Sequence, residues 1–147
     1  MPPLHPATVH FPIGLLLANA LLTVLYLRSG NRSLEISAYH CLVLGWFGAV
    51  VATLAGSIDA WRQVYSDPSI RNTALINWVN GHAASGLSTV WIYGMALLRR
   101  RRNQNILDDP QQRGGYLRLL ALGVVAVVVG GWLGGQLVYT FGLGVKG

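Results

Sequence analysis

The amino-acid sequence predicts an all-α fold, an integral membrane antiparallel four-helix bundle formed by a single domain over residues 1–147. Of these residues, 52% are hydrophobic and 11% are charged, and the mean hydropathy is +0.44. This composition is too apolar for a soluble domain of this length. The apolar residues form four runs, each near the ~20 residues that a helix needs to cross a ~30 Å hydrocarbon core. β-Barrel alternation is absent, so helices are the expected spanning elements.

The four predicted spans cover residues 11–27, 38–60, 81–98 and 117–139. A short link, 28–37, joins the first pair, and a basic inner loop, 99–116, joins the second pair. Because short connections make sequential helices antiparallel neighbours, an up-down-up-down bundle is expected. In the outer loop, 61–80, the sequence suggests a turn at Asp67-Pro68 followed by a short helix at the membrane surface.

The basic residues predict the orientation, because Lys and Arg near the ends of spans stay on the cytoplasmic side. The links after the first and third spans carry Arg28, Arg32, Arg99, Arg100, Arg101, Arg102, Arg113 and Arg118, whereas the other side holds Arg62, Arg71 and Lys146. Both termini are therefore expected on the outer, periplasmic side. Since the basic residues follow membrane topology, the net charge of +6 does not indicate nucleic-acid binding, and the expected partner is the lipid bilayer.

The single cysteine, Cys41, excludes an internal disulfide framework. The chain also has no C-x-x-C-H motif, so covalent attachment of a c-type haem is excluded. Any cofactor is therefore expected to be bound non-covalently.

The opening stretch, His5 to Gly14, places two imidazoles at the mouth of the first span. Ionisable groups at membrane depth are costly and usually serve ligands, ions or protons. Pro12 is the expected start of the helix, because proline is tolerated in a first turn. The alternative is a start near Pro6, which leaves Pro12 inside the helix and His10 deeper in the membrane.

Two histidines are predicted at one depth near the outer face. His10 precedes Arg28 by 18 residues, and His82 precedes Arg99 by 17. With a rise of about 1.5 Å per residue, each imidazole lies roughly 26 Å above the inner boundary. His40 begins the second span from the inside, roughly a membrane thickness away, so it cannot share their site.

Each of these two histidines is followed four residues later by a glycine, Gly14 or Gly86. Position i+4 lies one turn along the same face, so bare backbone adjoins each imidazole. The first and third helices of the bundle lie diagonally across the core, where two imidazoles can bind the iron of one b-type haem from opposite faces. We therefore predict His10 and His82 as iron ligands, with His5 either at the membrane interface or beside the ligating residues. Ordinary close packing of helices is the alternative explanation of the glycines.

Further residues complete the predicted cofactor site. Gly131, Gly134 and Gly135 of the fourth span leave a groove that suits either a cofactor or a packed helix. Asp59 lies level with the two histidines and can accept the remaining N–H of a ligating imidazole. An ion pair between Asp59 and Arg62 at the membrane surface is the alternative.

A haem-binding electron-transfer subunit is the leading hypothesis, and no stand-alone catalytic activity is expected. A classical hydrolase is disfavoured, because the spacing suggests no Ser-His-Asp arrangement. A second hypothesis is a non-catalytic structural subunit of a larger respiratory or photosynthetic complex, with a chlorophyll-type pigment or no cofactor. A small transporter is disfavoured, because the inner halves of the spans lack charged residues. Direct binding of copper or zinc is a further alternative, with His5, His10, His82 and Asp59 as ligands.

Four segments, HPATVHFPIG at 5–14, GSIDAW at 56–61, NGH at 80–82 and GGQLVY at 134–139, together resemble the bacterial membrane family called domain of unknown function 2231. The resemblance covers nearly the whole chain. The recurring positions of that family correspond here to His5, Pro6, His10, Phe11, Pro12, Asp59, Trp61, His82, Gly134, Gly135 and Tyr139. The family has no established activity. Some members are joined to Rieske-type iron–sulfur domains, which implies electron transfer, a separate redox subunit as partner, and the bacterial inner membrane as location.

Overall fold

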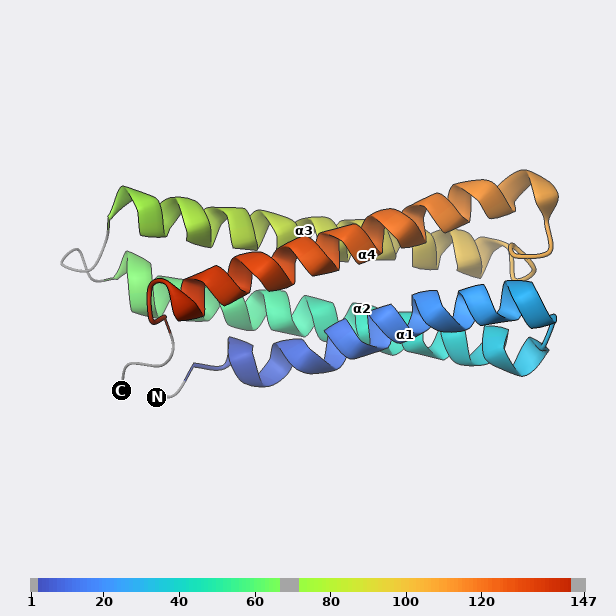
Figure 1. Ribbon diagram of the computed structural model, residues 1–147, viewed down its shortest axis with the longest axis horizontal. Helices are drawn as coiled ribbons and strands as arrows, with labels where there is room; N and C mark the ends of the chain where they lie inside the picture. Colours follow the sequence, from blue (N-terminus) through green and yellow to red (C-terminus); the bar gives the residue numbers. More distant parts are fainter. Residues whose placement is uncertain (1–2, 67–71, 144–147) are drawn as a thin grey trace.

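The chain folds into long helices that lie side by side (Figure 1). The computed structural model describes residues 3–66 and 72–143, and within these ranges the chain contains helices and no strands. The long helices are α1, His5–Ser29; α2, Arg32–Ala60; α3, Thr73–Arg102; and α4, Pro110–Tyr139. A π-helical turn, Trp61–Tyr65, continues α2. The prediction of an all-α fold is confirmed.

The first helix begins earlier than the expected start at Pro12. α1 starts at His5, with Pro6 in its first turn, where the missing N–H of proline costs nothing. Pro12 lies inside the helix and packs against Gly48 of α2, where an added Cβ would lie 3.1 Å from the Pro12 Cβ atom. α1 ends at Gly30, whose φ of 68° is a left-handed conformation that glycine adopts readily.

Polar side chains cap the other three helices. Asn31 accepts from the backbone N–H of Ser33 at the start of α2, Asn72 from that of Leu75 at the start of α3, and Asp109 from those of Gln111 and Gln112 at the start of α4. These caps lie beyond the apolar runs, so the helices are longer than the predicted spans. The inner loop is reduced to 103–109, and the second half of the predicted outer loop forms the first turns of α3. The predicted turn at Asp67-Pro68 lies outside the described residues.

Three helical segments of the described chain are long and apolar enough to cross a membrane: His5–Ser29, Arg32–Tyr65 and Pro110–Tyr139. They contain the first, second and fourth predicted spans. α3 has a similar length but carries more polar side chains, among them Asn77 and Asn80, and it does not meet the same hydropathy requirement. The apolar character of the other three segments supports a membrane protein.

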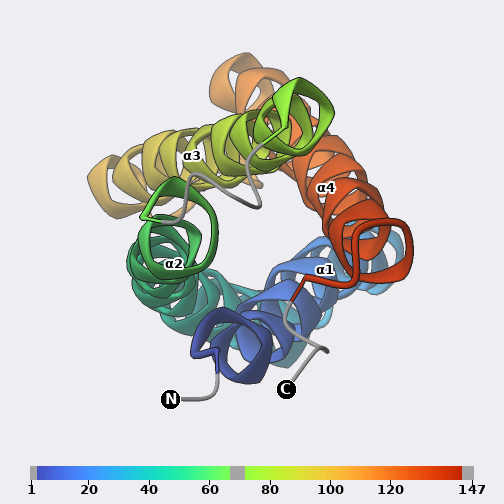
Figure 2. The same ribbon diagram turned by 90° about the vertical axis from the view of Figure 1, so that its left-hand side faces the viewer.

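The helices are arranged as two hairpins that face each other. α1 packs along α2 and α3 along α4, while α2 also touches α3 and α1 touches α4. Seen end-on, α1 lies opposite α3, and α2 lies opposite α4 (Figure 2). The core includes Leu16, Leu42, Tyr93, Tyr116 and Leu120. Side chains of α1 and α3 that face this interior can therefore meet across the diagonal.

Candidate functional site

The imidazoles of His5 and His82 meet across the diagonal between α1 and α3. Their Nε2 atoms are 3.3 Å apart, and the ring planes are nearly perpendicular, at 83°, with centroids 5.4 Å apart. Both residues are half-buried, and they lie at the end of the molecule where α1 begins and α4 ends (Figure 1). The structure thus gives His82 a histidine partner on the diagonal helix, and that partner is His5.

A backbone carbonyl fixes the other nitrogen of each ring. His5 Nδ1 lies 2.8 Å from the Ala52 oxygen on α2, and His82 Nδ1 lies 3.0 Å from the Gly130 oxygen on α4. Because a carbonyl oxygen only accepts hydrogen bonds, each Nδ1 must carry a proton and donate it. The Nε2 atoms of the neutral rings then direct lone pairs at each other. A proton or a metal ion between them removes this repulsion, and such lone pairs are also the donors that haem iron takes as axial ligands.

Glycines make both carbonyls reachable. Gly56 follows Ala52 by four residues and Gly134 follows Gly130 by four, so each glycine lies one turn along the same helix face. A Cβ at Gly56 would lie 2.9 Å from His5 Nδ1, and a Cβ at Gly134 would lie 3.1 Å from Cε1 of His82. Any larger residue would push the ring away from the backbone. Gly134 belongs to the site predicted from the sequence, whereas Gly56 does not.

The same combination, an accepting carbonyl with a glycine four residues later, occurs at two other contacts between helices. In both, a side chain donates to a carbonyl, and the residue four positions further on is a glycine. The pairs are Ser85 with Ala126 beside Gly130, at 2.9 Å, and Trp46 with Val90 beside Gly94, at 3.0 Å. A Cβ at either glycine would lie 3.0 Å from the donor atom. Glycine four residues after an accepting carbonyl is therefore a recurring signal of interhelical hydrogen bonding in this chain.

Asp59 acts on the backbone of α1. Its Oδ2 atom accepts a hydrogen bond from the His5 backbone N–H at 2.7 Å, and the side chain is buried. The first N–H groups of a helix have no partner within the helix, and the positive end of the helix dipole favours a carboxylate there. Asp59 therefore caps α1 from a neighbouring helix. It holds the main chain of His5 in place, which differs from the predicted hydrogen bond to an imidazole.

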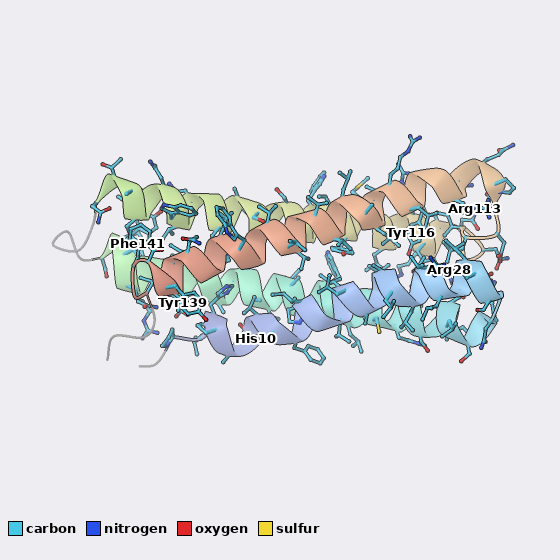
Figure 3. All side chains as sticks on the ribbon, viewed as in Figure 1. His10, Arg28, Arg113, Tyr116, Tyr139 and Phe141 are labelled. Carbon is cyan, nitrogen blue, oxygen red and sulfur yellow. The ribbon has the colours of Figure 1, made fainter. Side chains whose placement is uncertain are left out.

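The structure does not bring His10 to His82. The His10 side chain is exposed, and its Nδ1 lies 2.8 Å from the Pro6 oxygen of its own helix. Figure 3 shows His10 and Tyr139 near the same end of the molecule. His5 and His10 lie on different faces of α1, which begins at His5. Five residues turn a helix through about 500°, so His5 and His10 point about 140° apart.

The other predicted site residues do not touch the histidine pair. Gly14 and Gly131 are exposed, with open space where a Cβ would be. A Cβ at Gly86 would lie 3.7 Å from Thr53 Oγ1, and one at Gly135 would lie 4.0 Å from Tyr139 of the same helix. These glycines are explained by packing or by the lipid-facing surface rather than by the imidazoles. His40 is exposed, with its ring 6.0 Å from that of Tyr39.

A metal site with several protein ligands is not assembled in the described part of the chain. Within residues 3–66 and 72–143, no group of three or more His, Cys, Asp or Glu side chains is placed to hold an ion. The copper or zinc site that would combine His5, His10, His82 and Asp59 is therefore not formed. The donors that do converge are the Nε2 atoms of His5 and His82.

A second polar region lies at the opposite end of the molecule. The Tyr26 hydroxyl donates to Asp108, and Arg32 Nη1 lies 2.7 Å from the other oxygen of this carboxylate. The Tyr26 hydrogen bond and the Arg32 guanidinium hold the pKa of the Asp108 carboxyl below its usual value. Arg32 also donates to Asn105 at 2.6 Å. The loop between α3 and α4 is thus tied to the turn between α1 and α2.

A buried ion pair lies beside this network. Arg100 Nη2 donates to Glu35 Oε1, and both side chains are almost fully buried. The Arg100 guanidinium lies 5.2 Å from the centre of the Tyr39 ring and also donates to the carbonyl oxygen of Gln104. Glu35 is not among the functional residues predicted from the sequence. Its signal is that it is the one acidic residue in the basic link 28–37.

The long apolar helices and the polar groups enclosed between them define a helical membrane protein. A family model described as "Predicted membrane protein (DUF2231)" matches residues 1–147. The chain belongs to this family, which confirms the resemblance found in the sequence. No curated protein and no solved structure matches the chain. The family is of unknown function, so a function has to be argued from the site.

Proposed function

We propose that the protein is a membrane electron-transfer subunit that binds one b-type haem, with His5 and His82 as the axial ligands of the iron. The observation that carries this proposal is the 3.3 Å separation of two Nε2 atoms whose rings are both anchored through Nδ1. The sequence led us to expect bis-histidine ligation from His10 and His82. We now favour His5 in place of His10, because the His10 ring is exposed and bonded to its own helix.

The proposal includes four spans in a bacterial inner membrane, arranged as an antiparallel bundle with both termini on the periplasmic side. α3 exposes large apolar side chains as the other helices do, with Leu87, Trp91 and Leu98 exposed by 61%, 73% and 51%. An apolar surface of this kind suits contact with lipid. Arg28 and Arg113 lie at the end away from the histidine pair (Figure 3), and basic residues favour the cytoplasmic side. The haem site would then lie near the outer face.

The side chains present fit a haem through their donor chemistry. A ligating imidazole usually donates its second ring N–H to a carbonyl or carboxylate, which fixes the tautomer and makes the ligating nitrogen more basic. Both His5 and His82 have such a carbonyl partner. The Nε2 atoms of His5 and His82, 3.3 Å apart, would hold the iron of such a haem.

A bound haem would supply one-electron chemistry, while the chain positions it and excludes water. Asp59 holds the first turn of α1, and Gly56 and Gly134 set how far each ring stands from the neighbouring helix. Because the site would lie near the outer face, the electron partner is expected on that side. A separate redox subunit, with a Rieske-type iron–sulfur protein as the candidate, fits this position.

The test is an optical spectrum of the protein purified after expression with added haem precursor. We expect a reduced-minus-oxidised spectrum with the Soret change of a six-coordinate b-type haem. His5→Ala and His82→Ala should each abolish this signal or convert it to a five-coordinate form. His10→Ala is the matched control and should retain the wild-type spectrum.

Two outcomes would overturn the proposal. One is a folded, colourless and iron-free protein obtained with haem supplied. The other is loss of the signal in His10→Ala with retention in His5→Ala, which would restore the ligand pair expected from the sequence. An absorbance band of a magnesium pigment would replace haem by a chlorophyll-type cofactor and favour a subunit of a photosynthetic complex.

A further inference from the structure

The interior of the end opposite the histidine pair contains a polar cluster to which all four helices contribute. We call it the inner polar cluster; its members are Asn19 and Thr23 of α1, Glu35 of α2, Tyr93 and Arg100 of α3, and Tyr116 of α4. Each of these residues is less than one-tenth exposed, and Asn19 and Tyr93 are fully buried. Such a cluster inside a membrane bundle is costly unless its hydrogen bonds are satisfied.

Three atoms of the inner polar cluster have no hydrogen-bond partner within the described residues: Asn19 Oδ1, Thr23 Oγ1 and the Tyr93 hydroxyl. The orientation of Asn19 is fixed, because its Nδ2 atom donates to the Ala38 oxygen of α2 at 2.9 Å. Its Oδ1 atom therefore cannot exchange places with the satisfied nitrogen. Buried polar atoms without a protein partner commonly bind ordered water.

The three atoms belong to one neighbourhood. Asn19 and Thr23 are four residues apart on α1, so they lie on the same face. Tyr93 and Tyr116 belong to one buried core cluster, and Tyr116 lies beside Asn19 and near the Glu35–Arg100 pair. Hydroxyl and amide groups from opposite sides of the bundle therefore surround one region, which ends at the Glu35–Arg100 pair.

We propose that ordered water molecules occupy the inner polar cluster and complete the hydrogen bonds of Asn19, Thr23 and Tyr93. A buried water needs two to four polar partners, and the cluster offers acceptors and hydroxyl donors of this kind. A metal cation is disfavoured, because the Arg100 guanidinium already neutralises the Glu35 carboxylate. This inference does not depend on haem binding.

The proposed waters do not extend as far as the histidine pair. The polar side chains of α3 between the two regions are Ser85, Ser88 and Thr89. Ser88 is exposed, and the hydroxyls of Ser85 and Thr89 donate to backbone carbonyls at 2.9 Å each. They are satisfied without water. The proposed waters therefore belong to the inner half of the bundle and are separated from His5 and His82 by side chains that do not require water.

Radiolytic footprinting of the full-length protein in detergent tests the proposal, because hydroxyl radicals formed from bound water label adjacent side chains that bulk solvent does not reach. We expect labelling of Tyr93 even though it is fully buried, and none at Val64, which is equally buried in a separate apolar cluster. Tyr139, 90% exposed, is the positive control. Thr23→Val and Asn19→Leu should each reduce Tyr93 labelling several-fold.

Thr53→Val is the matched control, because the Thr53 hydroxyl bonds the Ala49 carbonyl of its own helix outside the inner polar cluster. Its Tyr93 labelling should equal that of the wild type. Tyr93 labelling as low as that of Val64 would overturn the proposal. So would labelling that persists unchanged in both cluster variants. Thr23→Val is nearly isosteric, so it gives a folded test even if Asn19→Leu does not fold.

Discussion

At the scale of single residues, Gly134 decides where the His82 ring can lie. In Gly134→Ala the added methyl group would lie 3.1 Å from Cε1 of His82, so we expect the ring to move and its bond to the Gly130 carbonyl to weaken. The expected result is a several-fold loss of haem affinity and a shift of the Soret band, measured by haem titration of purified protein. Gly131→Ala is the control, because a Cβ there meets open space. Equal effects of the two substitutions would contradict the role of Gly134.

The residue types of the site are evident in the sequence, but the pairing is not. Two histidines at one level and glycines four residues away are visible without a structure. Which histidine faces inward depends on where α1 starts, and two prolines made the start ambiguous. A start at His5 puts His5 inside and turns His10 outward. Helical periodicity predicts that His5 and His10 lie on different faces of one helix. The hydrophobic runs do not reveal which of these faces is buried.

At the scale of helices, Asp59 stabilises the start of α1 from a different helix. Asp59→Ala removes the acceptor of the His5 N–H, and a lost cap of this kind costs about 1 kcal/mol. We expect faster hydrogen exchange in the first turn of α1, measured by mass spectrometry. Asp59→Asn keeps a side-chain oxygen and should show a smaller effect.

Asp109→Ala provides the comparison, because Asp109 caps α4 at the other end of the molecule. In Asp109→Ala, hydrogen exchange should become faster at the backbone N–H groups of Gln111 and Gln112 and remain unchanged at that of His5. If Asp59→Ala left the exchange of the first turn of α1 unaltered, the capping role would be wrong.

The extent of the helices was underestimated because hydropathy measures the apolar part of a helix. Asn31, Asn72 and Asp109 cap helices outside the apolar runs, and the four arginines 99–102 form the last turn of α3. Number and order of the helices follow from the apolar runs. Their true ends follow from caps and from tertiary contacts such as that of Asp59, which no local pattern shows.

At the scale of the whole molecule, Asp108 joins the two hairpins at the end opposite the histidines. The Tyr26 hydrogen bond and the Arg32 guanidinium lower the pKa of the Asp108 carboxyl, so its ionised form stabilises the folded state. This stabilisation is present above the unfolded pKa, near about 3.9, and disappears as the pH falls through the lower folded pKa.

We therefore expect Asp108→Asn to lower the midpoint of thermal unfolding in detergent by a constant amount from about pH 7 to about pH 4, with the difference shrinking at lower pH. Arg113→Gln removes an exposed charge nearby and serves as the control. A difference between wild type and Asp108→Asn that persisted without change below about pH 3 would show that the ionised carboxylate is not the stabilising form.

The anchoring of the two histidines has a consequence for assembly. His5 of α1 bonds a carbonyl of α2, and His82 of α3 bonds a carbonyl of α4, so each hairpin carries its own ligand together with that ligand's anchor. Each hairpin is thus a complete half-site, and the site exists only where two halves meet. A haem bound between the two hairpins would hold them together. The affinity of the protein for haem would then depend on how strongly the two hairpins associate. Two hairpins produced as separate polypeptides should then be recruited to each other by the cofactor.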